Sequence, residues 1–141
     1  MKTSIAAAAL VLLTLSGCGQ SGPTRTPSPP GAKVFFIEPK DGAEVTAPVA
    51  VKFGIEGMEV APAGTEKEHS GHHHVLIDTR LEDPNAPMPA DANHVHFGKG
   101  QTEAALDLKP GKHTLQLILG DHNHIPHEPI VQSEVITITV K

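Results

Sequence analysis

From Lys33 onward, the chain consists of short stretches in which hydrophobic and polar residues alternate. A period of two is typical of strands that bury one face. The clearest example is the spacing of Leu115, Leu117 and Leu119. Gly, Pro, Asp and Asn residues, which favour turns, separate one stretch from the next. The pattern predicts strands at residues 33–37, 49–55, 72–78, 94–97, 102–108, 114–119 and 133–140.

These short strands, with no amphipathic helix between them, predict an all-β fold. We expect an immunoglobulin-like antiparallel β-sandwich of about seven strands. The turn Pro110-Gly111 leads into the alternating Leu strand, as at one corner of immunoglobulin-like domains. A Tyr at that corner often bonds to nearby backbone, and His113 stands in its place. We therefore predict a structural role for His113.

Two of the predicted strands contain His residues at alternate positions. In strand 72–78 both faces carry apolar residues, and the β-branched pair is the better inward choice. In strand 94–97 the apolar pair also points inward. The inward residues are then Val75, Ile77, Val95 and Phe97, and the outward ones are His72, His74, His94 and His96.

The start of the chain has the character of an export signal. Lys2 precedes an apolar run from Ile5 to Leu15, which is too short to span a bilayer as a helix. The run ends in Leu-Ser-Gly-Cys, which is similar to the lipobox of bacterial lipoproteins. We therefore predict a signal peptide at residues 1–17 and lipidation of Cys18; an ordinary secretory signal is the alternative.

A lipid at Cys18 would make the membrane a partner of this protein. Gly19, not Asp, follows the Cys, and by known sorting rules this favours the outer membrane, facing the periplasm. Residues 18–32 are rich in Gly, Ser, Thr and Pro, and are predicted to form a flexible tether. Residues 33–141 are long enough for one domain.

Composition narrows the choice of partners. The formal charge is −5, with no basic patch that would favour nucleic acid. Trp and Tyr are absent and Phe numbers four, so aromatic stacking on bases or sugars is disfavoured. The single Cys excludes an intramolecular disulfide. The unusual feature of the composition is the number of His residues, which is ten.

Neutral imidazole is a common transition-metal ligand, and residues i and i+2 of a strand lie on one face about 7 Å apart. In an immunoglobulin-like strand order, the His clusters would meet at one end of the sandwich. All-imidazole ligation suits copper or zinc ions. Met58 and Met88 would add thioether ligands that favour Cu(I), with packing as their alternative role. The candidate ligands are His72, His74, His94, His96, His122, His124 and His127.

Three segments, GHHHVLID (71–78), HFGKGQTEA (96–104) and PGKHTLQLILGDHNHIPHEP (110–129), resemble a bacterial family of uncharacterised proteins, the domain-of-unknown-function family 4399. The resemblance extends over residues 33–141. It implies an envelope location and a single domain, and it supplies no functional residues.

Three hypotheses for function follow. The first is a cell-envelope lipoprotein that binds copper or zinc for storage, delivery or resistance. The second is a non-catalytic interaction module whose His residues form a neutral network bonded to backbone. The third is a zinc-dependent hydrolase or hydratase that uses His94, His96 and His124, with Glu103 or Asp121 as general base.

Overall fold

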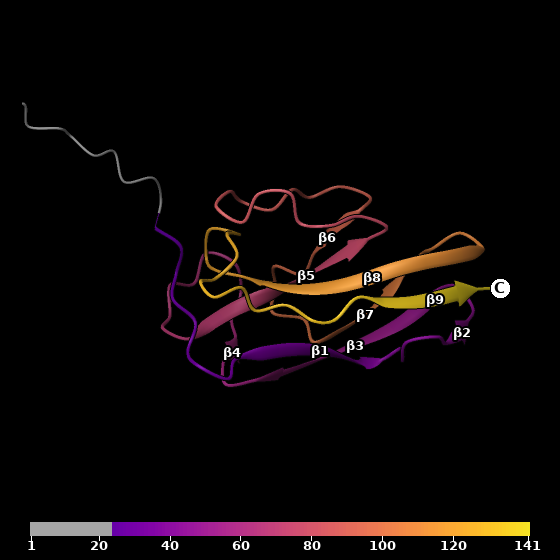
Figure 1. Ribbon diagram of the computed structural model, residues 1–141, viewed down its shortest axis with the longest axis horizontal. Coiled ribbons are helices and arrows are strands. Elements are labelled where there is room, and N and C mark those ends of the chain that lie inside the picture. The colour runs from indigo at the N-terminus through magenta and orange to yellow at the C-terminus, as the bar shows by residue number, and fades with distance from the viewer. Residues whose placement is uncertain (1–23) are drawn as a thin grey trace, which may run out of the picture.

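The computed structural model describes residues 24–141, which form two β-sheets packed face to face (Figure 1). The all-β sandwich predicted from the sequence is confirmed, because no helix occurs among the described residues. It follows that this part of the chain contains no helix of the length and apolar character needed to cross a membrane.

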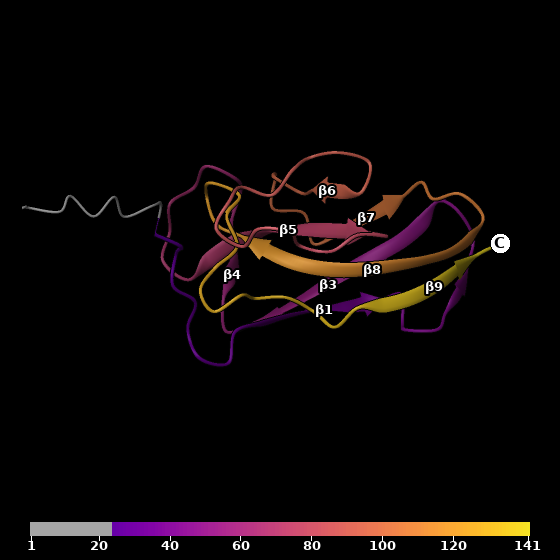
Figure 2. The same cartoon turned by 45° about the horizontal axis from the view of Figure 1, so that its top comes forward.

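The smaller sheet has the antiparallel order β1-β3-β7, and the larger has the order β2-β9-β8-β5-β4 with β6 paired to β5. Figure 2 shows the two layers from a second direction. The strands of the smaller sheet are β1 (Lys33–Glu38), β3 (Val49–Glu56) and β7 (Glu103–Leu106). Those of the larger sheet are β2 (Glu44–Val45), β4 (Glu59–Val60), β5 (Ser70–Ile77), β6 (His94–His96), β8 (Gly111–Gly120) and β9 (Ile136–Val140).

All the strands predicted from alternation exist, but the strand count and some boundaries differ. The two-residue strands β2 and β4 are additions, and each pairs in parallel, with β9 and β5 respectively. Two residues are too few for an alternating pattern to be recognised. Strand β9 begins at Ile136, later than residue 133, because Ser133 first bonds to Leu117 through both its backbone N–H and its hydroxyl.

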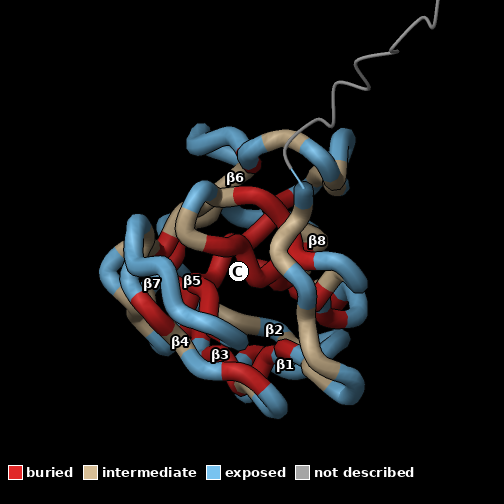
Figure 3. The backbone as a smooth tube through the Cα atoms, turned by 90° about the vertical axis from the view of Figure 1, so that its left-hand side faces the viewer, coloured by how far each residue is buried: buried red, intermediate tan, exposed pale blue. Residues whose placement is uncertain are grey.

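The main core fills the space between the sheets, as the buried segments in Figure 3 show. The predicted inward residues Val75 and Ile77 are buried there, together with the three alternating Leu residues of β8. Phe97 is also buried and Val95 packs against the core, as predicted. The outer face of the larger sheet is covered too, because Leu76, Met88 and Ile118 form a second, smaller cluster. Strand β5 is consequently buried along its whole length.

Part of the predicted tether lies against the domain. Residues 25–28 lie against the segment 126–129, with Ser28 N–H donating to Glu128 O and Glu128 N–H to Thr26 O, both at 2.9 Å. The Arg25 side chain donates to the carbonyls of Pro126 and His127. These bonds leave the described part of the predicted tether attached to the domain, which alternation alone had no means of indicating.

The structural role predicted for His113 agrees with its contacts. Its Nε2 donates to Lys109 O at 2.8 Å, and its Nδ1 donates to the Asp78 carboxylate at 2.7 Å. The bond to Asp78, with a smaller contribution from Lys109 O, raises the pKa of His113. Asp78 also accepts from Thr114 N–H, so the pair fixes the start of β8 against the end of β5.

His73 is the one inward His of β5, and it generates the first prediction. Its ring is fully buried beside Phe53, 5.0 Å between centroids, and neither ring nitrogen has a hydrogen-bond partner among the described residues. An unsatisfied buried polar group costs about 1–3 kcal/mol. The substitution His73→Leu should therefore raise the free energy of unfolding in urea by about 1–2 kcal/mol. Val75→Ala, at the next inward position, should lower it by creating a cavity. A destabilised His73→Leu variant would show that the ring has a polar partner.

Candidate metal centre

The site begins with the alternation of β5. Because His73, Val75 and Ile77 face the main core, His72 and His74 point to the opposite face of the larger sheet. Both side chains are nevertheless buried, with exposed fractions of 0% and 1%. Their ring nitrogens Nε2 lie 2.9 Å apart. Two imidazoles on one strand are thus already in contact.

Strand pairing adds a third imidazole. Strand β6 runs antiparallel to β5 in the register His74↔His96, and directly opposed residues project to the same face. His96 is half-buried and its ring centroid lies 5.0 Å from that of His74 and 4.9 Å from that of His72. The three rings each place one nitrogen within 4.8 Å of the others. They form a group with the spacing of metal ligands.

A fourth imidazole comes from the loop after β8. The His124 ring centroid lies 4.6 Å from that of His96, 5.0 Å from His72 and 5.9 Å from His74. His124 has a φ of 67°, a left-handed conformation that is uncommon for a residue with a Cβ. The loop thus turns back at His124 and places its ring over the sheet. We call these four residues, His72, His74, His96 and His124, the His cluster.

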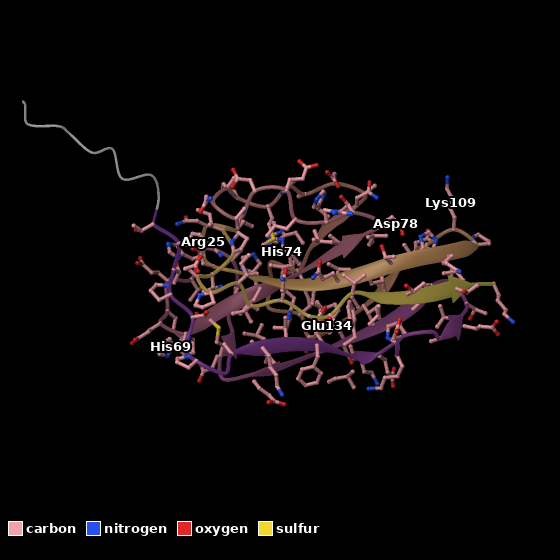
Figure 4. All side chains as sticks on the ribbon, viewed as in Figure 1. Arg25, His69, His74, Asp78, Lys109 and Glu134 are labelled. Atoms are coloured by element: carbon pink, nitrogen blue, oxygen red, sulfur yellow. The ribbon has the colours of Figure 1, made fainter. Side chains whose placement is uncertain are left out.

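Asp121 fixes the loop that carries His124. Its buried carboxylate accepts from Asn123 N–H at 2.8 Å, Ile125 N–H at 3.0 Å and Thr26 Oγ1 at 2.7 Å. Burial raises the pKa of this carboxyl, but the hydrogen bonds, that of Thr26 first, outweigh burial and lower it. Thr26 belongs to the N-terminal segment, so that segment is bonded to the loop that carries His124, which we call the metal-site loop. Figure 4 shows Arg25, of the same segment, at the same end of the molecule.

Two glycines provide space for the rings. A Cβ added at Gly98 would lie 2.3 Å from Cε1 and 2.6 Å from Nε2 of His96. A Cβ added at Gly120 would lie 2.8 Å from Nε2 of His74. Real contacts are never so short, so any larger residue at either position would have to displace an imidazole.

Three rings of the cluster, those of His72, His74 and His96, have a lowered pKa and are neutral at pH 7, which leaves lone pairs for a cation. Burial, followed by the nearby His96 and His124, lowers the pKa of His72 to about 4. Burial, followed by His72, lowers the pKa of His74 to about 2. Burial also lowers the pKa of His96. Protonation of these rings therefore does not compete with metal binding near neutral pH.

The other predicted ligands lie outside the His cluster, in separate hydrogen bonds. His94 shares the face of His96, but it lies opposite Leu76 and its Nδ1 is 2.8 Å from the Asp91 carboxylate. His122 bonds to Asn123. His127 is fully buried between two carbonyls, 3.1 Å from Ser70 O and 3.4 Å from Leu119 O. Cys18 lies outside the described residues.

The structure does not bring together the ligand set of the enzyme hypothesis, because His94 lies outside the His cluster. Its strand pair was His94 with His96, whereas the pair that meets the cluster on one strand is His72 with His74. Asp121, one of its two candidate bases, is occupied by three donors. Glu103 lies exposed on β7 of the other sheet.

Sequence reasoning missed the supporting residues more than the ligands. Gly98, Gly120 and Thr26 were not singled out, and Asp121 was considered only as a base. A signal for Asp121 was present, since Asp-x-Asn favours a turn closed by the Asp side chain. No local pattern reveals that Gly120 faces His74, an imidazole of a distant segment.

The residues of the His cluster fit a transition-metal ion. Nδ1 of His72, Nδ1 of His74 and Nε2 of His96 are buried without a hydrogen-bond partner among the described residues. Bonding of a buried imidazole to backbone carbonyls, the arrangement expected for a purely structural role, is found for His127 instead. Tetrahedral ligation at about 2.0–2.1 Å places ligand nitrogens about 3.3 Å apart. His72, His74 and His96 each place one nitrogen within 4.8 Å of the others, so small ring movements would bring these three imidazoles to that spacing.

The lowered pKa values predict a protein that loses stability in mild acid. Three buried rings, His72, His73 and His74, take up protons in the unfolded chain near pH 6.5 but resist them when folded, down to pH values of about 4, 4 and 2. The contribution of these neutral rings to the free energy of unfolding is therefore complete above pH 6.5, and it is lost as the pH falls below that value. For each ring, the free energy of unfolding falls by up to about 1.4 kcal/mol for every pH unit below 6.5. His113, whose pKa is raised, has the opposite dependence.

Urea unfolding of the metal-free protein at pH 7, 6 and 5 measures this loss. The variant His73→Leu is the matched control, because it removes one of the three rings without changing the cluster. Its unfolding free energy should fall less steeply, by up to about 1.4 kcal/mol per pH unit. Equal stability at pH 7 and pH 5 in the unsubstituted protein would contradict burial of neutral rings.

No curated protein and no solved structure matches this chain. The sequence model of the domain of unknown function DUF4399 matches residues 51–141, which include every member of the His cluster. The resemblance noted in the sequence is thus confirmed, and the chain belongs to the DUF4399 family.

Proposed function

We propose that this protein is a cell-envelope lipoprotein that binds one copper or zinc ion through His72, His74, His96 and His124. The observation that carries the proposal is the convergence of four imidazoles from three chain segments, with ring nitrogens that find no partner in the described part of the chain. Imidazole favours Zn and Cu over harder cations, and Cu has the higher intrinsic affinity. Storage, delivery or resistance are the roles that such a site serves without catalysis.

Partial burial of the site supports a binding role that holds its ion. His72 and His74 are almost fully buried, while His96 and His124 are half-buried and border the solvent side. An ion would therefore reach the cluster from the side of β6 and the loop after β8. A deep pair of ligands with a more accessible pair is suited to uptake followed by retention.

The proposed location rests on the sequence and on where the N-terminal segment attaches. A lipid on Cys18 would anchor the chain only a few residues before Arg25, and Arg25 lies at the end of the sandwich that holds the metal-site loop (Figure 4). The site would then face the membrane surface to which the protein is attached. An outer-membrane anchor would place it in the periplasm.

The first test is metal content and affinity. The chain carrying Cys18→Ser, with no affinity tag containing His, should bind close to one equivalent of Cu(II) or Zn(II) by elemental analysis and isothermal titration. The preparation has to keep residues 24–32, because Thr26 bonds to Asp121 of the metal-site loop. If the affinity for both ions is only that of isolated His side chains on a protein surface, the result would support the interaction-module hypothesis.

A pair of variants on β6 tests the ligand assignment. His96→Ala removes a member of the His cluster and should weaken binding at least tenfold, equivalent to about 1.4 kcal/mol. His94→Ala removes the other half-buried His of the same three-residue strand, and its affinity should stay within about twofold, or about 0.4 kcal/mol. Equal losses in the two variants would contradict the separation of His94 from the site.

Gly98→Ala tests whether the space beside His96 matters. Gly98 has no positive φ, so the added methyl acts through its contact with the His96 ring and not through backbone strain. We expect this variant to bind metal at least tenfold more weakly, while the double variant His96→Ala/Gly98→Ala binds no more weakly than His96→Ala. This non-additivity is the expected sign of two residues acting on one ligand. Independent, additive losses would refute it.

A further inference from the structure

The second methionine of the described chain lies beside the His cluster. A Cβ added at Gly120 would meet Met88 Cε at 3.0 Å and His74 Nε2 at 2.8 Å, so the thioether methyl and that ring nitrogen border the same small space. Figure 4 shows a side-chain sulfur next to the labelled His74. Met88 N–H also donates to His124 O at 2.8 Å. The residue is thus held next to one ligand by its backbone and next to another by its side chain.

Met58 provides the contrast. It is buried in the main core between the sheets, away from the face that carries the His cluster. Met88 belongs to the small cluster on the outer face, with Leu76 and Ile118. The two methionines have similar exposed fractions, 8% and 6%, yet only Met88 lies near an imidazole of the cluster. The packing role considered for both from the sequence therefore describes Met58 better than Met88.

Met88 also lines a cavity on the outside of the sheet. The cavity has a volume of about 170 Å³ and is bordered by the segment 81–89 and by His94. Glu82 and Asp83 are at its edge and give it negative charge, which attracts cations. Met88 is therefore shared between an acidic cavity and the His cluster. A soft donor at this position is suited to receive a soft cation on its way to the imidazoles.

We propose that Met88 is a thioether ligand that makes this site selective for Cu(I) over Zn(II). The inference rests on the proposed metal function and names the ion it serves. Thioether sulfur is a soft ligand that binds Cu(I) well and contributes little to Zn(II) or Cu(II). Cu(I) accepts a mixed set of imidazole and thioether donors, and a change of side-chain torsions alone would bring the Met88 sulfur toward an ion held by His74.

The test compares two volume-conserving variants in the full chain carrying Cys18→Ser. That background removes the only thiol, which would itself bind Cu(I). Met88→Leu deletes the sulfur and keeps most of the volume, and Met58→Leu is the matched control at the buried methionine of the main core. Cu(I) affinity is measured without oxygen by competition with bicinchoninate, and Zn(II) affinity by competition with a zinc-selective dye.

Met88→Leu should lower Cu(I) affinity at least tenfold and leave Zn(II) affinity within twofold, while Met58→Leu changes neither. X-ray absorption of the Cu(I) form should show a sulfur neighbour that Met88→Leu removes. Unchanged Cu(I) affinity, or an equal loss for both ions, would overturn the role of Met88 while the site itself stands. Failure of the unsubstituted protein to bind either ion would instead overturn the proposed function.

Discussion

Burial of β5 on both of its faces is the constraint on which the rest of the structure depends. Its inward residues complete the core between the sheets, so their alternation fixes the direction of every other side chain on the strand. A shift of one residue would turn His72 and His74 into the apolar core. The strong preference for Val75 and Ile77 inside therefore also selects the face on which the imidazoles meet. Folding and site formation follow from the same register.

The other two members of the His cluster, His96 and His124, are positioned in different ways, one by strand pairing and one by a loop. His96 is placed by the ladder between β5 and β6, together with its neighbours Val95 and Phe97, which pack into the main core. His124 depends on the Asp121 carboxylate and on the left-handed turn, and Asp121 in turn accepts a bond from Thr26. Ordering of the N-terminal segment and ordering of the metal-site loop are therefore coupled. Any pull on the N-terminus would act first on the loop that carries His124.

Much of the fold, and part of the site, could be predicted from sequence. Alternation was sufficient for the long strands, since burying one face of a sheet requires it. It also placed His72, His74 and His96 outside the main core. It did not separate His96 from His94, because both lie on the same face and only the register with β5 puts one beside His74 and the other beside Leu76. The capture of His94 by Asp91, three residues away, is a local bond that alternation does not encode.

The ligand-free His cluster is an unfavourable arrangement, and this bears on what the fold is for. Several ring nitrogens are buried with no hydrogen-bond partner within residues 24–141, at a cost of about 1–3 kcal/mol each, which is a large fraction of the stability of a domain of this size. An ion that binds only the folded protein stabilises it by about 2.7 kcal/mol at one hundred times its dissociation constant. The cost of the unpartnered nitrogens and the stabilisation by a bound ion are thus of the same order. This balance supports the proposal that a metal ion completes the cluster, with Asp121 fixing the loop that carries His124 and with Gly98 and Gly120 leaving space for the rings of His96 and His74.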